Sequence, residues 1–425
     1  MSARKQRVLD LAREHLMPHR VDVWTKLGTP LVIGKREGYR IWDLDGHELF
    51  DLHLNGGTFN LGHRHPALVA VLKRALDEVD IGNHHFPNVA AVELARRLAE
   101  LTPGDLQYTV FATGGSEAID VAIKAARHTT GRRTIVGVEG AYHGRTGLSG
   151  AAGDPRAAGF FHSDQPADFV TVPFDDAEAL ERVLSTREVA AFLLETVPAT
   201  MGFRMPSAGY LPAVRELCTR HGALYVADEV QTGLGRTGPL WGVETYGVEP
   251  DVLVTGKGLS GGLYPIAATI LSPRAGGFLR ENGWAHVSTF GGAELGCRVA
   301  LEVLDRTTDA ATRSNVATIA ERYTRGLHAI AAEEPFLRGV RQLGLVMGLE
   351  TAHAAGGMLL SRALYDAGVW AMYAGFDLSV IQWKPGLLMD EASCDLTLAR
   401  LRTALKAARQ AASERDAAAA QPPRG

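Results

Sequence analysis

The chain has 425 residues, which is too long for one compact hydrophobic core and predicts two domains. Hydrophobic residues make up 46% of the sequence and the formal net charge is −4, so neither nucleic acid nor an anionic membrane is indicated as a partner. The three cysteines form no CxxC pair, which indicates a reducing compartment. We expect a cytoplasmic protein, because the charged N-terminus lacks a secretory h-region and no apolar run approaches the roughly 20 residues of a membrane span.

The first elements are three helices and a hairpin. Residues 1–16 favour a helix that "MPHR" ends. The alternating stretch 38–53 predicts a hairpin, because it contains an Asp-Gly turn. A helix follows Pro66, and a further helix is predicted over residues 89–101.

From residue 108 onwards, short apolar runs alternate with helical stretches. Such a pattern is typical of β-α-β units and of a largely parallel sheet covered on both faces. The predicted strands are 108–112, 134–139, 169–173, 189–195, 223–229, 251–255 and 267–272. The predicted helices between them are 116–128, 176–184 and 210–221.

After residue 296 a long helical segment begins, and strand-like stretches follow at 339–350 and 378–388. We therefore predict an α/β fold with a large domain and a smaller α+β domain built from both chain ends. The predicted parts are an N-terminal segment of the small domain (1–54), the large domain (55–296), the C-terminal part of the small domain (297–412) and a disordered, low-complexity tail (413–425).

Reactive side chains follow the predicted strands at their carboxyl ends, where parallel sheets bind ligands. They are Tyr142 with His143, Glu195, Asp228 with Gln231, Lys257, and the segment "TGGSEA" at 113–118. One such coincidence would mean little, but five that converge on one edge of a sheet predict a functional site.

Lys257 lies between two glycines, directly after a predicted strand. It can grip a phosphate, act as a nucleophile, or be an ordinary loop lysine. A Walker motif needs glycine at 251 and Ser or Thr at 258, where the sequence has Asp251 and Gly258. A dinucleotide G-x-G-x-x-G is also absent. Gly115 and Ser116 at a helix start can still bind another phosphate, although the bland alternative is a serine N-cap.

Lys257 and Asp228 together fit the needs of pyridoxal 5′-phosphate (PLP). A lysine amine forms a Schiff base with an aldehyde, and a buried carboxylate keeps a pyridine nitrogen protonated. Tyr142 offers an aromatic ring to stack on the cofactor, and residues 113–118 offer a phosphate cradle. The alternatives are a helix-capping aspartate and a solvated lysine, which are common fates for each residue alone and improbable for the set.

The sequence resembles the class III aminotransferases of fold type I over nearly its whole length. The segments that carry the resemblance are "VADEVQTGLGRTG", "EPDVLVTGKGLSGGLYPI" and "HVSTFGG". The resemblance implies a PLP-dependent transaminase with a mainly parallel seven-stranded sheet, and a homodimer that shares its active sites across the interface.

The resemblance also implies residue roles. Lys257 would form the Schiff base and, helped by its flanking glycines, move a proton. The other implied roles are Asp228 at the pyridine nitrogen, Gln231 near the ring hydroxyl, Gly115 and Ser116 at the phosphate, Tyr142 stacked on the ring with His143 beside it, Glu195 as the family's glutamate at that strand end, and Thr289 at the phosphate of the neighbouring subunit's cofactor.

Two positions depart from the family pattern. Where many relatives have a second acid, the sequence has Thr200, and where they have an arginine that grips an α-carboxylate, it has Gln382. Either Lys384, Arg145 or Arg204 takes over that task, or the amino acceptor lacks a carboxylate beside the reacting carbon. The second interpretation is preferred and favours a ketone or aldehyde from specialised biosynthesis, including one on a peptide or carrier.

Other residues carry weaker signals. Trp24 and Phe59 either line the substrate entrance or belong to the core. The same two alternatives apply to Phe86. The histidine pairs in "NLGHRHPA" and "IGNHHFPN" lack carboxylate or cysteine partners at a recognisable spacing, so we expect no metal. The competing functions are a PLP-dependent decarboxylase, epimerase or aminomutase of the same fold, and a cofactor-binding protein without turnover.

Overall fold

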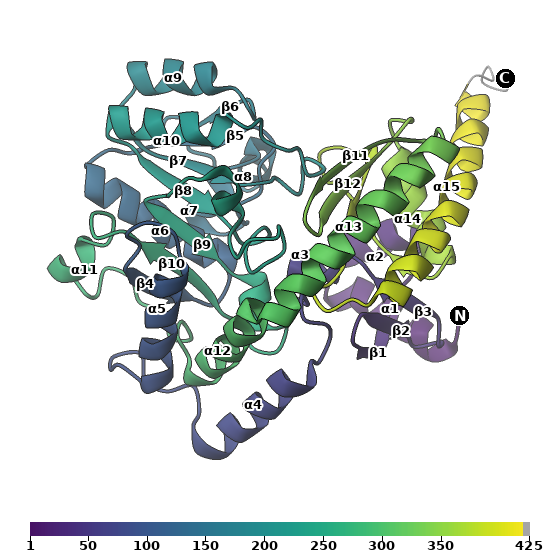
Figure 1. The fold of residues 1–425 in the computed structure, drawn as a ribbon, viewed down its shortest axis with the longest axis horizontal. Helices are drawn as coiled ribbons and strands as arrows, with labels where there is room; N and C mark the ends of the chain where they lie inside the picture. The colour runs from purple at the N-terminus through teal and green to yellow at the C-terminus, as the bar shows by residue number, and fades with distance from the viewer. Residues whose placement is uncertain (420–425) are drawn as a thin grey trace.

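The computed structural model describes residues 1–419 and shows a larger and a smaller lobe (Figure 1). The larger lobe contains a seven-stranded sheet. In spatial order its strands are β4 (Tyr108–Ala112), β10 (Ala267–Leu271), β9 (Val252–Thr255), β8 (Leu224–Asp228), β7 (Val189–Glu195), β5 (Thr134–Val138) and β6 (Phe169–Val172). β10 runs antiparallel to both of its neighbours, whereas the ladders from β9 to β6 are all parallel. The predicted mainly parallel sheet is confirmed.

Helices cover both faces of this sheet because its strands carry apolar side chains on both sides. In β7, Phe192 and Leu194 belong to one core cluster and Leu193 belongs to the other. The helices on the first face are α5 (Val89–Leu101), α9 (Ala177–Thr186) and α10 (Tyr210–His221). The second face packs against α6 (Gly115–Thr130) and α11 (Phe278–Glu281). This layering leaves the carboxyl ends of the strands open for a site.

The smaller lobe contains two four-stranded sheets built from both chain ends. The first has the order β1 (Ile33–Glu37), β2 (Arg40–Asp43), β3 (Glu48–Asp51) and β13 (Val369–Trp370). The second has the order β11 (Leu337–Leu343), β12 (Val346–Thr351), β15 (Val380–Trp383) and β14 (Met372–Tyr373). β13 pairs parallel with β3, with Val369 opposite Phe50, so the last quarter of the chain completes a sheet begun by the first.

The helices of the smaller lobe are α1 (Ala3–His15), α2 (Pro18–Lys26), α13 (Ala310–Glu333), α14 (Gly356–Asp366) and α15 (Glu391–Ala419). The remaining helical segments are α3 (Leu54–Gly57), α4 (Pro66–Glu78), α7 (Gly147–Ala151), α8 (Pro155–Phe160), α12 (Glu294–Thr308), η1 (Gly242–Tyr246) and η2 (Lys257–Ser260). Within residues 1–419, no helix is both long and apolar enough to cross a membrane.

The sequence predictions hold for most elements and are wrong at the C-terminus. The hairpin at 38–53 and the helices after Pro66 and over 89–101 are confirmed. "MPHR" ends the first helix, but Pro18 also begins α2, since proline is well tolerated at the first position of a helix. The tail predicted to be disordered from 413 is helical as far as Ala419, and residues 420–425 lie outside the described residues.

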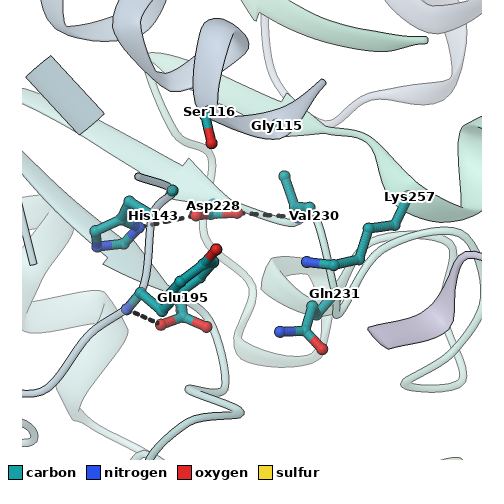
Figure 2. Close-up of a pocket in the computed structure, with 10 residues that line it drawn as sticks. Gly115, Ser116, His143, Glu195, Asp228, Val230, Gln231 and Lys257 are labelled. Carbon is teal, nitrogen blue, oxygen red and sulfur yellow. Dashed lines mark hydrogen bonds and ion pairs between the residues drawn. The ribbon is translucent and has the colours of Figure 1, made fainter. Parts of the chain in front are cut away.

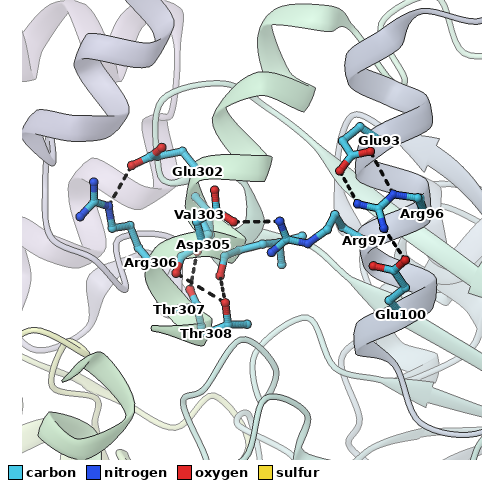
Figure 3. A network of polar contacts seen from close by, with 11 residues as sticks. Glu93, Arg96, Arg97, Glu100, Glu302, Val303, Asp305, Arg306, Thr307 and Thr308 are labelled. Carbon is cyan, nitrogen blue, oxygen red and sulfur yellow. Dashed lines mark hydrogen bonds and ion pairs between the residues drawn. The ribbon is translucent and has the colours of Figure 1, made fainter. Parts of the chain in front are cut away.

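The lobes meet around α12, and the boundary predicted at residue 296 falls inside this helix. Figure 3 shows Arg97 of α5 paired with Asp305 of α12, with 2.9 Å between Nη1 and Oδ1. A second contact between the lobes is buried. The guanidinium of Arg236 donates to Asn60 Oδ1 and to the carbonyl oxygens of Leu345 and Pro385. These acceptors come from three distant parts of the chain, so one side chain ties both lobes together.

Candidate active site

Four strand ends and one helix start meet around a cavity of about 220 Å³ (Figure 2). The residues that line it are Gly115, Ser116, Tyr142, His143, Gly144, Glu195, Asp228, Val230, Gln231 and Lys257. β7 ends at Glu195 and β8 ends at Asp228, while Lys257 follows the end of β9. The structure therefore brings together every cofactor and catalytic residue that the sequence predicts, except Thr289.

Asp228 and His143 form a buried pair at the back of the cavity. His143 Nδ1 lies 2.8 Å from Asp228 Oδ2, and both side chains are buried. The other oxygen, Oδ1, accepts a hydrogen bond from the backbone N–H of Val230 at 3.1 Å. The carboxylate of Asp228 is therefore fixed in orientation, with a histidine that can share its charge.

Glu195 is a buried carboxyl group beside this pair. Its Oε1 accepts from the backbone N–H of Tyr142 at 2.9 Å, and Oε2 accepts from the backbone N–H of Ala199 at 3.4 Å. Burial raises the pKa of Glu195 to about 7, and the nearby carboxylate of Asp228 acts in the same direction. Such a group can hold or release a proton near neutral pH.

Lys257 begins the short helix η2, and its own backbone is strained. Its φ of +38° lies in the left-handed region, which is unusual for a residue with a side chain. Burial lowers the pKa of the Lys257 amine from its ordinary value, while Asp228 and Glu195 oppose this decrease. The following Gly258 allows close packing, because a Cβ there would lie 2.8 Å from Asn60 Nδ2.

The segment from His53 to Gly57 also shapes the site, and the sequence analysis missed it. Leu54, Asn55 and Gly56 all have positive φ values in this segment. A Cβ at Gly56 would lie 2.8 Å from Lys257 Cε and 3.3 Å from Gln231 Oε1. The signal in the sequence is "NGG" at 55–57, a turn that favours positive φ.

We expect Gly56→Ala to lower the transamination rate by about 10²-fold, because the new methyl group displaces the lysine side chain. Backbone strain at φ +73° adds a loss of roughly 1 kcal/mol of stability. Gly46→Ala is the matched control, since Gly46 has φ +87° and open space around its Cβ position. Steady-state rates and thermal melts of both variants check this prediction, and equal activity in the two would contradict it.

The cavity fits PLP by its polar atoms. Oε1 of Gln231 is buried and has no hydrogen-bond partner within residues 1–419, and the same holds for His143 Nε2. Gly115 and Ser116 lie in the first turn of α6, where backbone N–H groups and the helix dipole favour a phosphate. A phosphorylated ring with a hydroxyl group and a basic nitrogen could pair with the start of α6, with Gln231 and with the carboxylate of Asp228.

Comparisons with known proteins show the family of this chain. The family model described as Aminotransferase class-III matches residues 24–405. An uncharacterized aminotransferase of Archaeoglobus fulgidus is 46% identical over 406 residues, which cover 96% of this chain and 95% of that protein. The chain belongs to the class III aminotransferases. Enzymes of this family use PLP, so the predicted family, cofactor and enzyme class are confirmed.

Relatives of this class III chain differ in their named substrates. A putrescine aminotransferase of Pectobacterium atrosepticum is 32% identical over 421 residues, covering 96% of this chain and 90% of that protein. The crystal structure of the ornithine aminotransferase from Toxoplasma gondii ME49 has a TM-score of 0.87 at 26% identity, and the match covers 96% of each chain. The comparisons thus show the family, and the residues of the pocket must indicate which substrate the chain accepts.

The two positions that depart from the class III pattern have local partners. The Thr200 hydroxyl donates to the carbonyl oxygen of Gly140 at 3.1 Å. The amine of Lys384 donates to Gln382 Oε1 at 2.7 Å, and both side chains are buried. Burial lowers the pKa of Lys384 well below its ordinary value, and Arg236 adds to this decrease. Lys384 is therefore a weaker cationic partner for a carboxylate than an arginine at this place would be.

The remaining predicted residues of the aminotransferase lie outside the 220 Å³ cavity. Thr289 lines a separate cavity of about 130 Å³ together with Phe86, so its role at the partner's phosphate stays a prediction. Trp24 and Phe59 line another cavity. His63 Nε2 lies 2.8 Å from Asp51 Oδ2, and within residues 1–419 no group of three or more His, Cys, Asp or Glu is placed to hold a metal.

Proposed function

We propose that this aminotransferase transfers the amino group of an amino acid to a ketone or aldehyde that lacks a carboxylate beside the reacting carbon. The observation that carries the proposal is the buried pair of Gln382 and Lys384, at the position where the family resemblance implies an arginine. The amide has no charge, and burial lowers the pKa of the Lys384 amine well below its ordinary value. A carboxylate that entered here would lose its water without gaining a full positive partner.

We further propose how the cavity residues share the chemistry. When bound, PLP supplies an aldehyde that condenses with an amine and a ring that withdraws electrons from the reacting carbon. Lys257 holds the aldehyde carbon between turnovers and then carries the proton at the reacting carbon. Asp228 keeps a proton at the ring nitrogen, and His143 fixes the orientation of Asp228. Gly115 and Ser116 would bind the phosphate, and Gln231, which lines the same cavity, would lie near the ring hydroxyl.

The carboxylate of the amino donor needs a cation, and Arg145 is well placed to supply one. Its guanidinium lies 5.2 Å from the centroid of the Tyr142 ring, which lines the cavity. A guanidinium keeps its charge and binds a carboxylate through two hydrogen bonds. We propose in addition a homodimer in which Thr289 reaches the cofactor phosphate of the partner subunit. The acceptor includes carbonyl groups on larger biosynthetic molecules such as a peptide or carrier.

The test compares acceptors that differ only in the carboxylate. We expect the pyridoxamine form of the wild type to react faster with acetaldehyde than with pyruvate, and faster with phenylacetaldehyde than with phenylpyruvate. Gln382→Arg should shift the preference towards the 2-oxo acids by about tenfold or more, because it restores a charged, forked partner. The readout is the return of the PLP absorbance after each acceptor is added.

Gln382→Met is the matched control, since it removes the hydrogen bond to Lys384 without adding charge. It should lower stability and leave the order of acceptors unchanged. If the wild type prefers the 2-oxo acids and arginine at position 382 changes nothing, the proposal is wrong.

A further inference from the structure

A second, larger cavity of about 680 Å³ lies in the smaller lobe between α2, β1 and the segment after β3. We call it the aromatic cavity. Its apolar lining includes Trp24, Phe59, Trp370 and Met372. The rings of Trp24 and Trp370 meet edge to face, with centroids 5.5 Å apart. Its volume and apolar walls are those of a small-molecule site.

The one carboxylate in this lining, Asp51, is fully engaged. Its Oδ2 lies 2.8 Å from His63 Nε2, and its Oδ1 accepts from the backbone N–H groups of His53 and Leu54 at 3.0 Å and 2.7 Å. The Phe59 ring stacks on His63, with centroids 3.9 Å apart. Both oxygens of the carboxylate are thus engaged with neighbouring groups of the chain.

Two guanidinium groups give the aromatic cavity a positive charge. Arg20 of α2 and Arg36 of β1 line it and are both exposed. Within residues 1–419, neither guanidinium has a carboxylate oxygen within 4.0 Å, whereas the adjacent Lys35 pairs with Glu37 at 3.0 Å. Two unpaired arginines beside aromatic walls match a ligand with an apolar body and an anionic end.

The same short segment connects the aromatic cavity with the PLP site. His53 and Asn55 line the aromatic cavity, and the next residue, Gly56, packs against Lys257 Cε. The pKa of His53 is lowered first by burial and then by the charges of Lys384 and Lys257. The segment from His53 to Gly56 therefore borders both sites, with Gly56 against Lys257 and with His53 and Asn55 in the lining of the aromatic cavity.

We propose that the aromatic cavity holds the apolar body of the substrate, and that Arg20 and Arg36 bind an anionic group at the end remote from the reacting nitrogen. This inference rests on the proposed function, in which the acceptor has no carboxylate beside the reacting carbon. The anionic group is a carboxylate, phosphate or sulfonate, because a planar guanidinium binds each of these through parallel hydrogen bonds. The cavity therefore selects long amphipathic amines and carbonyl compounds.

The test uses matched pairs of amines as donors for the PLP-loaded enzyme. The pairs are 4-(aminomethyl)benzoate with benzylamine, and 8-aminooctanoate with octylamine. We expect half-saturation by the carboxylated amine at a concentration about tenfold lower than for its neutral partner. In the double variant Arg20→Gln/Arg36→Gln this difference should vanish, with the rate for benzylamine unchanged. Absorbance of the pyridoxamine form gives both the half-saturation concentration and the maximal rate.

Arg7→Gln is the matched control, because Arg7 is an exposed arginine of α1 outside the cavity lining. It should keep the preference of the wild type. Equal half-saturation by both members of each pair, or a preference that survives the double variant, would overturn this inference alone. If no amine of either pair is converted, this inference fails, whereas the proposed function is decided separately by the comparison of aldehydes with 2-oxo acids.

Discussion

Lys257→Ala should abolish turnover, with a rate loss of at least about 10²–10⁴-fold, and leave PLP bound without a covalent link. The phosphate cradle at the start of α6 and the pair of Asp228 with His143 do not depend on the lysine side chain. Truncation also removes a side chain whose amine pKa is lowered by burial, so the fold should tolerate it.

Borohydride reduction followed by peptide mapping checks this assignment. In the wild type the pyridoxyl group should be found on Lys257, and in the variant on no lysine. Lys384 is the informative alternative, because its amine is also buried with a lowered pKa. A pyridoxyl group found on Lys384 in the wild type would refute the role of Lys257.

Asp228→Asn should retain the bound cofactor and slow the proton transfer by roughly 10²–10³-fold, which corresponds to about 2–4 kcal/mol. An amide cannot keep the ring nitrogen protonated, and it also weakens the contact to His143 Nδ1. Stopped-flow absorbance of the half-reaction with an amino donor measures the loss.

Asp251→Asn is a matched change of carboxylate to amide just before β9, at the end of the strand away from Lys257. Asp251 Oδ2 pairs with Arg215 Nη1 at 2.7 Å and accepts from the backbone N–H of Tyr225. It should affect stability and leave the half-reaction unchanged. Near-wild-type rates for Asp228→Asn would show that this carboxylate has no part in the chemistry.

Most of the large sheet could be predicted because its strands are short apolar runs separated by helical periodicity. The direction of β10 could not be read from its composition, since an apolar strand has the same sequence pattern in either orientation. The connection from Thr255 to Ala267 does contain a signal, because it has no helical pattern long enough for a parallel crossover. At the C-terminus, low complexity suggested disorder, but alanine strongly favours helix and α15 continues to Ala419.

The candidate site was predictable where a reactive side chain stands at the end of a predicted strand, as for Glu195, Asp228 and Lys257. Contacts between distant segments were not predictable. No local pattern indicates that Gly56 packs against Lys257, or that Gln382 accepts a hydrogen bond from Lys384. These contacts depend on how the lobes pack, and packing rather than periodicity decides which amines are buried and have a lowered pKa.

The pairing of β3 with β13 has a consequence for synthesis on the ribosome. The strands β1 to β3 emerge early, but their sheet gains its fourth strand only when Val369 can lie opposite Phe50. Until then, the edge of β3 exposes unpaired backbone groups, which is the condition under which nascent chains associate wrongly. The large sheet contains no N-terminal strand and can form first. The sheet formed by the first fifty residues can therefore be completed only after nearly the whole chain has been synthesised. We expect its docking to be among the last steps of folding.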